Sequence, residues 1–371
     1  MRLLLAGGGT AGHINPAIAM ARYVRSRRPS SDILFIGAKG GMEEKLVVEA
    51  GFALETFPMR GFKHSLSPKA CVYNLATAGK MRSAVKQAGE IIDRFNPDVI
   101  LGTGGFACFP PLYAGAKKGI PTAIHESNAL PGRSNRLLSR YVDRVMIGFE
   151  DAARYFPKKK TQFTGNPLRE GMVYSKKSEA KKLLGIDTPL VYSFWGSLGA
   201  SEMNRITAEL FKLEMENSAE FTHIHSAGTL GHKKMPEHLA NLGIDINGYK
   251  KIDLREYVYD APTVMAAADV ILCRAGAMTV SELAATGTPS VIIPSPNVSG
   301  HHQHNNAHAI ADRGGAVFLE ESDCSAQRLY DEINGLLSDP ERMERMSAAA
   351  STIAVYDAGE KIYKSLLELI G

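Results

Sequence analysis

Long apolar runs and paired cysteines are both missing from this sequence. No run of about 18 consecutive apolar residues occurs among its 371 residues, so no membrane-spanning helix is predicted. The four cysteines show no CxxC spacing, which favours the reduced thiols of a cytosolic protein over a disulfide framework. The apolar run Leu3–Ala6 is too short for a signal peptide and enters a glycine turn, so we interpret it as a first β-strand.

Two catalytic motifs are also absent. No GxxxxGK[ST] sequence occurs, which excludes a P-loop kinase. A nucleophile-elbow hydrolase is not supported either, because the nearest candidate to GxSxG, Gly196–Gly199, lacks the spacing. The remaining composition, 44% hydrophobic and 22% charged, is typical of a soluble globular protein, and the length allows two domains with separate cores.

Acidic residues are absent from one long segment. Residues 57–89 contain no Asp or Glu but six Lys or Arg, interleaved with apolar residues such as Phe62, Leu66 and Leu75. Residues 1–165 carry 24 Lys and Arg against 12 Asp and Glu, a net of +12, whereas residues 166–371 carry 19 against 27, a net of −8. The mixture predicts an anionic membrane surface as a partner of the first half and no nucleic acid, although a solvated basic face is the alternative.

Two further basic patterns bear on binding. Arginines 133, 136, 140 and 144 recur at nearly helical spacing, which predicts one helical stripe beside the membrane segment. His301, His302, His304 and His308 invite a metal interpretation, but no carboxylate accompanies them as in HExxH. We therefore predict no metal site and interpret this segment as polar side chains of a binding loop.

The segment Asp269–Pro294 predicts a strand, a glycine turn, a helix and a second strand. Its apolar runs are continuous and β-branched, as in a parallel strand that is buried on both faces. The helix opens at a glycine, so its free N–H groups predict an anion site at the strand's carboxyl end. Glu282 lies too deep to cap the helix and could bind paired sugar hydroxyls. An ordinary βαβ unit with a tight turn is the alternative.

The first half opens with a similar turn. Gly7, Gly9 and Gly12 fit the dinucleotide pattern GxGxxG, but no acid ends the next strand, Ile33–Ile36, so NAD is not indicated. The glycines still allow a ligand to approach a helix N-terminus. His13 stands on the first turn of that helix, either as a residue that caps the turn or as a general base.

Strands and helices alternate through both halves, which predicts an α/β protein with two doubly wound, Rossmann-like domains facing a central cleft. The predicted strands are Leu3–Ala6, Ile33–Ile36, Asp98–Leu101, Pro121–His125, Val145–Ile147, Leu190–Phe194, Phe221–Ser226, Ile252–Leu254, Val270–Cys273 and Ser290–Ile293. We expect an N-terminal domain at 1–165 with the C-terminal helix 354–371, and a second domain at 166–353. Thr164–Arg169 is interpreted as the linker.

Six motifs occur in order over nearly the whole chain: GGGTAGHINPAIA near the start, HESN at 125–128, TGNPLR at 164–169, GSLGA at 196–200, CRAGAMTVSELAATGTP at 273–289 and HHQHNN at 301–306. Together they resemble the bacterial MurG glycosyltransferase family. That resemblance implies a GT-B fold and transfer of N-acetylglucosamine from UDP-GlcNAc to the lipid-linked muramyl-pentapeptide (lipid I), which forms lipid II for peptidoglycan. It also implies a peripheral protein at the cytoplasmic face of the bacterial plasma membrane.

The resemblance implies roles for individual residues. Ser197 would hold the UDP phosphate, residues 277–279 would bring a helix N-terminus to the diphosphate, and Glu282 would bind the ribose. The implied donor residues are Arg169, Ser197, Val258, Ala277, Met278, Thr279, Glu282, Gln303 and Asn306. The implied acceptor residues are Thr10, Gly12, Gly104, Gly105 and Asn128, with His13 as the catalytic base.

The chain departs from the family pattern at three positions: Phe106, Trp195 and Leu198 stand where the family often has tyrosine, glycine and glutamine. Trp195 must either point away from the phosphate turn or narrow it. The mechanism we expect is inverting displacement without a metal or other cofactor, with helix N-termini stabilising the departing diphosphate. The alternatives are a diacylglycerol-type glycosyltransferase, a UDP-GlcNAc epimerase and a catalytically inactive nucleotide-sugar sensor.

Overall fold

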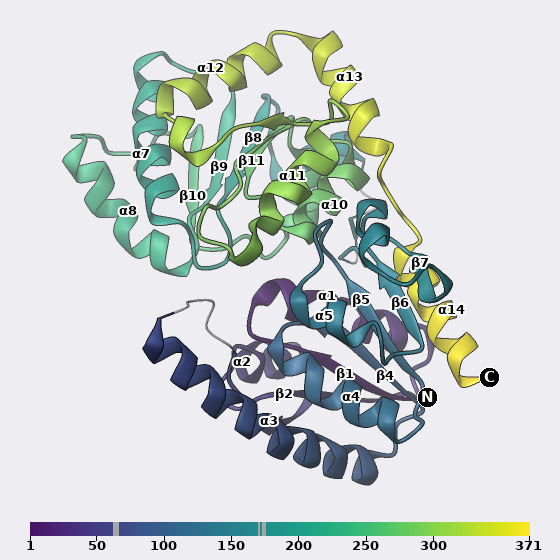
Figure 1. Cartoon of the computed structure of the whole chain (residues 1–371). Coiled ribbons are helices and arrows are strands. Elements are labelled where there is room, and N and C mark those ends of the chain that lie inside the picture. The colour runs from purple at the N-terminus through teal and green to yellow at the C-terminus, as the bar shows by residue number, and fades with distance from the viewer. Residues whose placement is uncertain (62–66, 170, 173–175) are drawn as a thin grey trace. The chain divides into compact units, whose positions relative to one another are not determined.

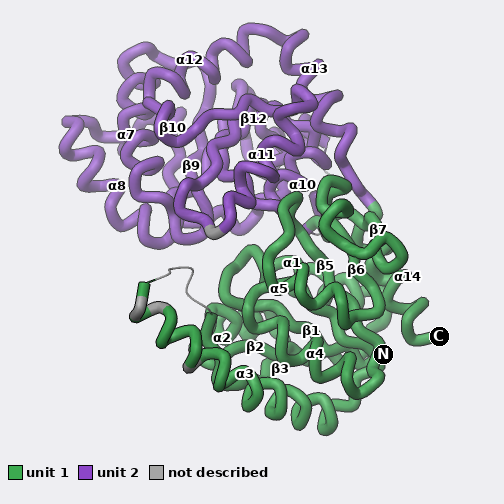
Figure 2. Tube along the Cα trace, viewed as in Figure 1, with its two compact units in different colours: residues 1–168, 357–371 green, residues 169–356 purple. Residues whose placement is uncertain are grey.

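The structure is a computed structural model that describes residues 1–61, 67–169, 171–172 and 176–371. The chain divides into two compact units, which Figures 1 and 2 show as separate bodies of sheet and helix. Unit 1 comprises residues 1–168 and 357–371, and unit 2 comprises residues 169–356. The last helix of the chain therefore belongs to the same unit as the first strand.

Unit 1 contains a parallel sheet with the strand order β3-β2-β1-β4-β5-β6-β7 among its described residues. The strands are β1 (Arg2–Gly7), β2 (Asp32–Ala38), β3 (Ala53–Phe57), β4 (Val99–Gly104), β5 (Thr122–Glu126), β6 (Arg144–Ile147) and β7 (Thr161–Phe163). The α-helices are α1 (Ala11–Arg27), α2 (Glu43–Glu49), α3 (Pro68–Phe95), α4 (Phe109–Lys117), α5 (Arg133–Leu138) and α14 (Ala358–Ile370). The strand order reverses between β1 and β4, and ligands of doubly wound sheets bind at such switch points.

Unit 2 repeats this topology with the parallel order β10-β9-β8-β11-β12-β13. The strands are β8 (Leu190–Phe194), β9 (Thr222–Ser226), β10 (Ile252–Arg255), β11 (Val270–Cys273), β12 (Ser290–Ile292) and β13 (Val317–Phe318). The α-helices are α6 (Lys177–Leu184), α7 (Ser201–Glu216), α8 (Thr229–Asn241), α9 (Ala261–Ala267), α10 (Ala277–Thr286), α11 (His302–Ala311), α12 (Ala326–Leu337) and α13 (Pro340–Ser351). Its switch point lies between β8 and β11.

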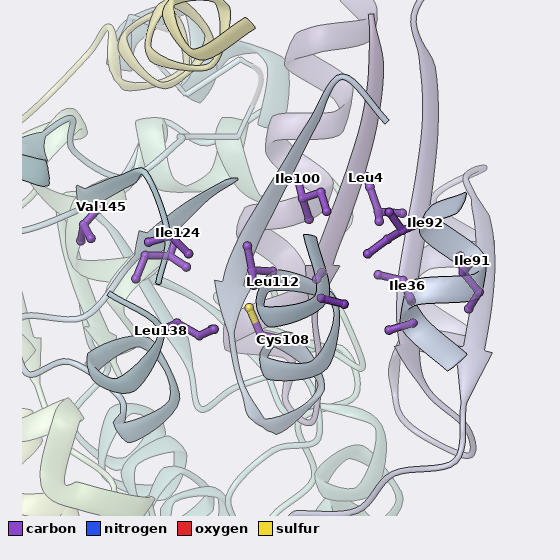
Figure 3. Close-up of a cluster of buried hydrophobic side chains, with 14 of the residues drawn as sticks. Leu4, Ile36, Ile91, Ile92, Ile100, Cys108, Leu112, Ile124, Leu138 and Val145 are labelled. Atoms are coloured by element: carbon purple, nitrogen blue, oxygen red, sulfur yellow. The ribbon is translucent and has the colours of Figure 1, made fainter. Parts of the chain in front are cut away.

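Both faces of the first sheet are buried, which explains why its strands are apolar throughout. Leu3 and Leu5 of β1 pack with α1 and α14, whereas Leu4 and Ala6 pack on the opposite face with α3 and α4. This alternation follows from the two-residue period of a strand. Figure 3 shows the buried cluster on the face of Leu4, in which side chains of β1, β2, β4 and β5 meet those of α3, α4 and α5.

The prediction of one helical arginine stripe is wrong. Helix α5 ends at Leu138, so Arg140 lies in a turn and Arg144 opens strand β6. Pairing of β6 with β5 ends the helical periodicity, because buried Val145 and Met146 belong to the sheet. The Arg144 guanidinium donates hydrogen bonds to Gln162 (3.1 Å), Ser365 (3.1 Å) and Glu368 (3.0 Å) and so fastens α14 to the sheet.

The segment Thr164–Arg169, which was interpreted as a linker, contains the boundary between the units, but its start is not a free connection. Thr164 is fully buried and Asn166 is 2% exposed, so the start of this segment is part of the unit 1 core. The backbone N–H of Thr164 donates to the Ile147 carbonyl (3.1 Å), and the Asn166 amide donates to the Ser127 carbonyl (3.0 Å). The boundary between the units falls at Arg169.

Candidate functional site

The turn after β8 lies at the switch point of unit 2. Gly196 and Gly199 adopt positive φ angles of 98° and 81°, and a Cβ on Gly199 would lie 2.1 Å from the Ala227 carbonyl oxygen. The backbone N–H of Thr229 donates to the Ser197 carbonyl (3.0 Å), and that of Leu230 donates to Leu198 (3.2 Å). The start of α8 therefore holds the Ser197 turn in one conformation.

Trp195 points away from this turn. Its side chain is 3% exposed, and its indole Nε1 donates to Thr207 Oγ1 of α7 at 3.0 Å. Of the two outcomes expected for this bulky residue, burial in the core is the one observed. The tryptophan therefore anchors the turn to α7.

Helix α10 begins immediately after β11, the neighbour of β8 in the sheet. Its N-cap is Gly276, no side-chain cap satisfies it, and its first turn contains no acidic residue. Ala277, Met278 and Thr279 thus supply backbone N–H groups at a positive helix end, which is an arrangement that binds anions. Asn306 of α11 is buried and donates to the Ala275 carbonyl at 3.1 Å, so α11 supports this turn.

Glu282 forms a bidentate ion pair with Arg169. The distances are 2.6 Å from Arg169 Nε to Oε1 and 2.7 Å from its terminal nitrogen to Oε2. The Glu282 side chain is 2% exposed and that of Arg169 is 41% exposed. A carboxylate offers about four lone-pair positions, so Glu282 can bind Arg169 and still accept hydrogen bonds from a ligand.

The other two predicted donor residues also lie in unit 2. Gln303, in the first turn of α11, accepts a hydrogen bond from the Ser295 N–H at 2.8 Å. Val258 is 4% exposed and lies in the loop between β10 and α9. Both flank the loops that follow strands β10 and β12.

In unit 1, the predicted base His13 lies at the switch point between β1 and β4. The imidazole packs over the backbone of the turn after β4: a Cβ on Gly104 would lie 2.8 Å from His13 Nδ1, and one on Gly105 would lie 3.2 Å from Cδ2. These two glycines, at φ 107° and 83°, are therefore required by the histidine as well as by the turn. Thr103 Oγ1 donates to the His13 carbonyl at 2.7 Å and fixes the start of α1.

The electrostatics of His13 suit a base that is unprotonated at neutral pH. Burial lowers the pKa of its imidazole, and the nearby Glu126 charge only partly offsets that effect. A hydrogen bond with the Thr103 backbone also raises this pKa without reversing the effect of burial. His125, by contrast, is fully buried with both ring nitrogens engaged, by the Gly165 carbonyl and by Ser127 Oγ, as expected of a structural histidine.

Glu126 organises the loop that follows β5. This buried carboxylate accepts hydrogen bonds from the Asn128 backbone (2.9 Å) and amide (3.0 Å), from the Gly132 N–H (3.0 Å) and from the Asn135 amide (3.0 Å). Asn128, a predicted acceptor residue, is thus oriented by Glu126. The sequence analysis singled out Asn128 and missed Glu126 and Asn135, which the loop brings together.

The glycine turn after β1 contains an internal anion. Thr10 is the N-cap of α1 without a side-chain cap, and Gly12 is exposed in the first turn. The Glu43 carboxylate, 1% exposed, accepts hydrogen bonds from the N–H groups of Gly9 (3.3 Å) and Ala38 (2.9 Å). A dinucleotide would need the Gly9 amide for its phosphate, so the structure supplies a second reason against NAD. The sequence analysis missed Glu43, the acidic residue that binds the amide of Gly9.

The histidine-rich segment distributes its side chains among separate partners. His304 Nε2 lies 3.1 Å from Glu320 and His308 Nδ1 lies 2.9 Å from Asp312, so carboxylate partners exist that the sequence did not reveal. Within the described ranges, no group of three or more His, Cys, Asp or Glu side chains could hold a metal ion. Nor does any helix in the described part of the chain have the length and apolar character needed to cross a membrane.

Comparisons with known proteins agree with this architecture. Residues 3–147 match the N-terminal domain of glycosyltransferase family 28, and residues 190–362 match its C-terminal domain. A Ruminiclostridium cellulolyticum protein is 41% identical over 373 residues, which cover 100% of both chains. An Acetivibrio thermocellus protein is 39% identical over 373 residues, covering 100% of this chain and 98% of that one. Both are named UDP-N-acetylglucosamine–N-acetylmuramyl-(pentapeptide) pyrophosphoryl-undecaprenol N-acetylglucosamine transferase.

Solved structures share the fold. The crystal structure of Acinetobacter baumannii MurG has a TM-score of 0.74 at 24% identity and covers 99% of each chain. A putative UDP-N-acetylglucosamine 2-epimerase from Listeria monocytogenes has a TM-score of 0.69 at 14% identity, covering 99% of this chain and 96% of that one. The family matches over both units define the chain as a glycosyltransferase, and its two Rossmann-type units give it the GT-B fold. Within that class, the chain belongs to the MurG family.

Proposed function

We propose that the protein transfers N-acetylglucosamine from UDP-GlcNAc to the 4-hydroxyl of the muramyl sugar in lipid I and so forms lipid II for peptidoglycan. The observation that carries this proposal is the full-length identity of 39–41% to two transferases named for this reaction. Fold alone does not choose between transferase and epimerase, because both kinds of structure resemble the chain. The relatives' names favour the transferase.

Unit 2 is the proposed donor unit. The Ser197 turn and the N-terminus of α10 follow adjacent strands, and both present backbone N–H groups where a diphosphate would lie. Glu282, oriented by Arg169, would accept hydrogen bonds from the ribose hydroxyls. The uracil would lie near the Val258 backbone, with Gln303 near the sugar and Asn306 behind the loop.

Unit 1 is the proposed acceptor unit, and the proposed reaction is a single displacement with inversion. His13 takes the proton from the muramyl hydroxyl as that oxygen attacks the anomeric carbon, and the carbon–oxygen bond to UDP breaks. Thr10, Gly12, Gly104, Gly105 and Asn128 would position the acceptor. The lowered pKa of His13 supports this role, because the imidazole is then a free base at neutral pH.

The test is UDP release from UDP-GlcNAc in the presence and absence of lipid I. A transferase releases UDP only when lipid I is present, and the product carries one more N-acetylglucosamine. A diacylglycerol-type enzyme would release UDP only with a diacylglycerol acceptor. An epimerase would act on UDP-GlcNAc without any acceptor, and an inactive sensor would bind UDP without turnover.

The reaction is expected to proceed without a metal ion. The uncapped N-terminus of α10 and the glycine-turn N–H groups would stabilise the departing diphosphate, which is the role a cation would otherwise have. EDTA should therefore leave the initial rate of UDP release unchanged. Inhibition by EDTA that Mg²⁺ or Mn²⁺ reverses would contradict this prediction and direct attention back to His304 and His308.

The proposed location is the cytoplasmic face of the bacterial plasma membrane, as a peripheral protein, because the acceptor is a polyprenyl lipid. Helix α3, the long helix at the lower edge of Figure 1, exposes Val72 (70%) and Leu75 (78%). Arg82 and Lys86 follow at helical spacing on the same side and are exposed. Phe62 and Leu66, also predicted to enter the interface, lie outside the described residues.

The structure removes one cation from this predicted surface. The Arg60 guanidinium stacks 3.7 Å from the centre of the Tyr73 ring and donates to Thr77 Oγ1 at 3.1 Å. Arg60 therefore stabilises α3 internally and is a poor partner for lipid headgroups. Lys69, Lys80, Arg82 and Lys86 are exposed and make up the surface to be tested.

Vesicle sedimentation tests the membrane prediction. The protein should pellet with anionic liposomes and be released by high salt, since each well-placed cation contributes about 1 kcal/mol at the surface. Changing Lys69, Lys80, Arg82 and Lys86 to Glu should leave it in the supernatant. A matched control variant changes four exposed lysines of unit 2 to Glu: Lys182, Lys233, Lys234 and Lys250. It alters the net charge by the same amount and should still pellet with the liposomes. Equal loss of pelleting in both variants would show that net charge alone determines membrane binding, and would contradict a specific role for the α3 surface.

A further inference from the structure

A row of buried polar side chains lies behind the Ser197 turn in unit 2. His223 and His225 are two residues apart on β9, so both project from the same face of the sheet, beneath α7. Phe211 of α7 contacts both rings edge-on, with centroid distances of 5.2 and 5.9 Å. The members of the row, all at most 1% exposed, are Ser193 of β8, His223 and His225 of β9, and Asn204 and Glu214 of α7.

These side chains form one continuous chain of hydrogen bonds. Glu214 Oε1 lies 2.7 Å from His223 Nδ1, and His223 Nε2 lies 2.7 Å from Ser193 Oγ. The same hydroxyl lies 2.6 Å from His225 Nδ1, and His225 Nε2 lies 3.1 Å from Asn204 Oδ1. The chain ends where Asn204 Nδ2 donates to the Ala227 carbonyl at 2.9 Å.

The protons in this chain can be assigned from its Asn204 end. The Ala227 carbonyl can only accept, so the Asn204 NH₂ faces it and the Asn204 carbonyl faces His225. His225 Nε2 must therefore carry a proton. Burial, reinforced by His223 and by His232 of α8, lowers the pKa of His225 well below its ordinary value, so this ring is neutral and its Nδ1 carries none.

The assignment continues to Glu214. His225 Nδ1 accepts the single proton of the Ser193 hydroxyl, so Ser193 must accept from His223 Nε2–H. Because His223 Nε2 already carries a proton, the 2.7 Å contact between His223 Nδ1 and Glu214 requires one more. That proton lies between His223 Nδ1 and the Glu214 carboxyl group. The pair then carries no net charge, which makes its complete burial tolerable.

We infer that Glu214 is a positioning residue for the donor site: its hydrogen bond at His223 Nδ1 keeps a ring proton on Nε2 and thereby directs every hydrogen bond of the row toward Ala227. The far end of the row reaches the proposed phosphate turn. Asn204 bonds the Ala227 carbonyl, and the adjacent residues 228–230 contact the Ser197 turn so closely that a Cβ on Gly228 would lie 2.2 Å from the Gly199 nitrogen. Reversal of the row would turn the Asn204 carbonyl toward Ala227, where two acceptors would repel. The role of the row at the donor site rests on the proposed function, but its proton positions do not.

The first test is ¹⁵N NMR of the histidine rings in the full-length protein. His223 should show a proton on Nε2 at neutral pH, because Nε2 donates to Ser193. His225 should show a proton on Nε2 only. A His223 ring with a bare Nε2, or a His225 ring protonated on Nδ1, would overturn the inference whether or not the protein has transferase activity.

The second test separates hydrogen-bond direction from charge. In Glu214→Gln the amide can donate to His223 Nδ1, so the direction of the row survives while the extra proton is lost. We expect His223 to keep its proton on Nε2, and KM for UDP-GlcNAc to stay within about 2-fold of wild type. Glu214→Leu leaves His223 Nδ1 with neither a donor nor an acceptor at position 214. In this variant KM for UDP-GlcNAc should rise about 10-fold, with KM for lipid I unchanged.

Phe211→Leu is the matched control, because Phe211 is buried on the same side of α7 and forms no hydrogen bond through its side chain. It should lower the melting temperature without changing the His223 signals or either KM. Equal KM changes in Glu214→Leu and Phe211→Leu would show that core packing alone sets the donor site. If Glu214→Gln does not preserve KM for UDP-GlcNAc, the direction of the hydrogen bonds in the row does not set the donor site.

Discussion

Replacement of His13 by alanine is expected to reduce kcat by about 10²–10⁴-fold while leaving the affinity for UDP nearly unchanged, because help from a general base acts in the transition state. The imidazole lies in unit 1 against Gly104 and Gly105, whereas the proposed donor residues lie in unit 2, so the substitution leaves each of those residues in place. Initial rates of UDP release with lipid I, together with calorimetric titration of UDP, measure the two quantities.

The pH profile provides a sharper test of the same residue. Burial lowers the pKa of His13, so the wild-type kcat/KM profile should keep its plateau as pH falls to 6.5 and decline only below that value. The decline should be absent from the His13→Ala profile. Exposed Asn15 on the same helix provides the control, since Asn15→Ala should keep both the rate and the acid limb. Retention of most of the turnover by His13→Ala would remove the imidazole from the chemistry.

Replacement of Glu282 by alanine is expected to raise KM for UDP-GlcNAc by about 10- to 100-fold. The substitution would remove the proposed acceptor of two ribose hydroxyls, which corresponds to roughly 1.5–3 kcal/mol for charge-assisted hydrogen bonds. It also leaves the Arg169 guanidinium without its bidentate partner, so a loss of stability should accompany the loss of affinity.

Two further variants separate these effects. Glu282→Ala combined with Arg169→Ala removes the unpaired cation and should recover part of the melting temperature but not the donor affinity. The control is Glu237, an exposed acid on α8 in the same unit. Glu237→Ala should change neither the melting temperature nor the affinity for UDP-GlcNAc. If Glu282→Ala binds UDP as tightly as wild type, the carboxylate serves only as a structural partner of Arg169.

Much of the secondary structure could be predicted because it depends on neighbouring residues. The strands Leu190–Phe194 and Val270–Cys273 have the predicted bounds. Their signals were local, because strands that are covered on both faces have unbroken β-branched runs. The pattern of alternating strands and helices likewise predicted two doubly wound units.

The failures occurred where distant contacts override a local period. The spacing of the arginines from 133 to 144 suits a helix, yet pairing of β6 with β5 ends that helix at Leu138. The polar and glycine-containing start of Thr164–Arg169 suggested a linker, yet Thr164 and Asn166 find buried partners on β6 and in the loop after β5. In both cases the free energy of burying backbone and side-chain groups exceeds a weak local preference.

The sequence by itself determined the fold class, the family and the positions of the glycine turns, because each follows from residue types at short, regular spacing. Only the tertiary structure decided what each functional side chain touches. Glu282 meets Arg169 across 113 positions in the sequence, and Glu43 reaches the amide of Gly9 across 34. The order of strands β1, β4, β8 and β11 in the two sheets brings the turns of each switch point together, and no local pattern encodes that order. The direction of the buried row from Glu214 to Ala227 depends on five distances at once, so it exists only in the folded chain.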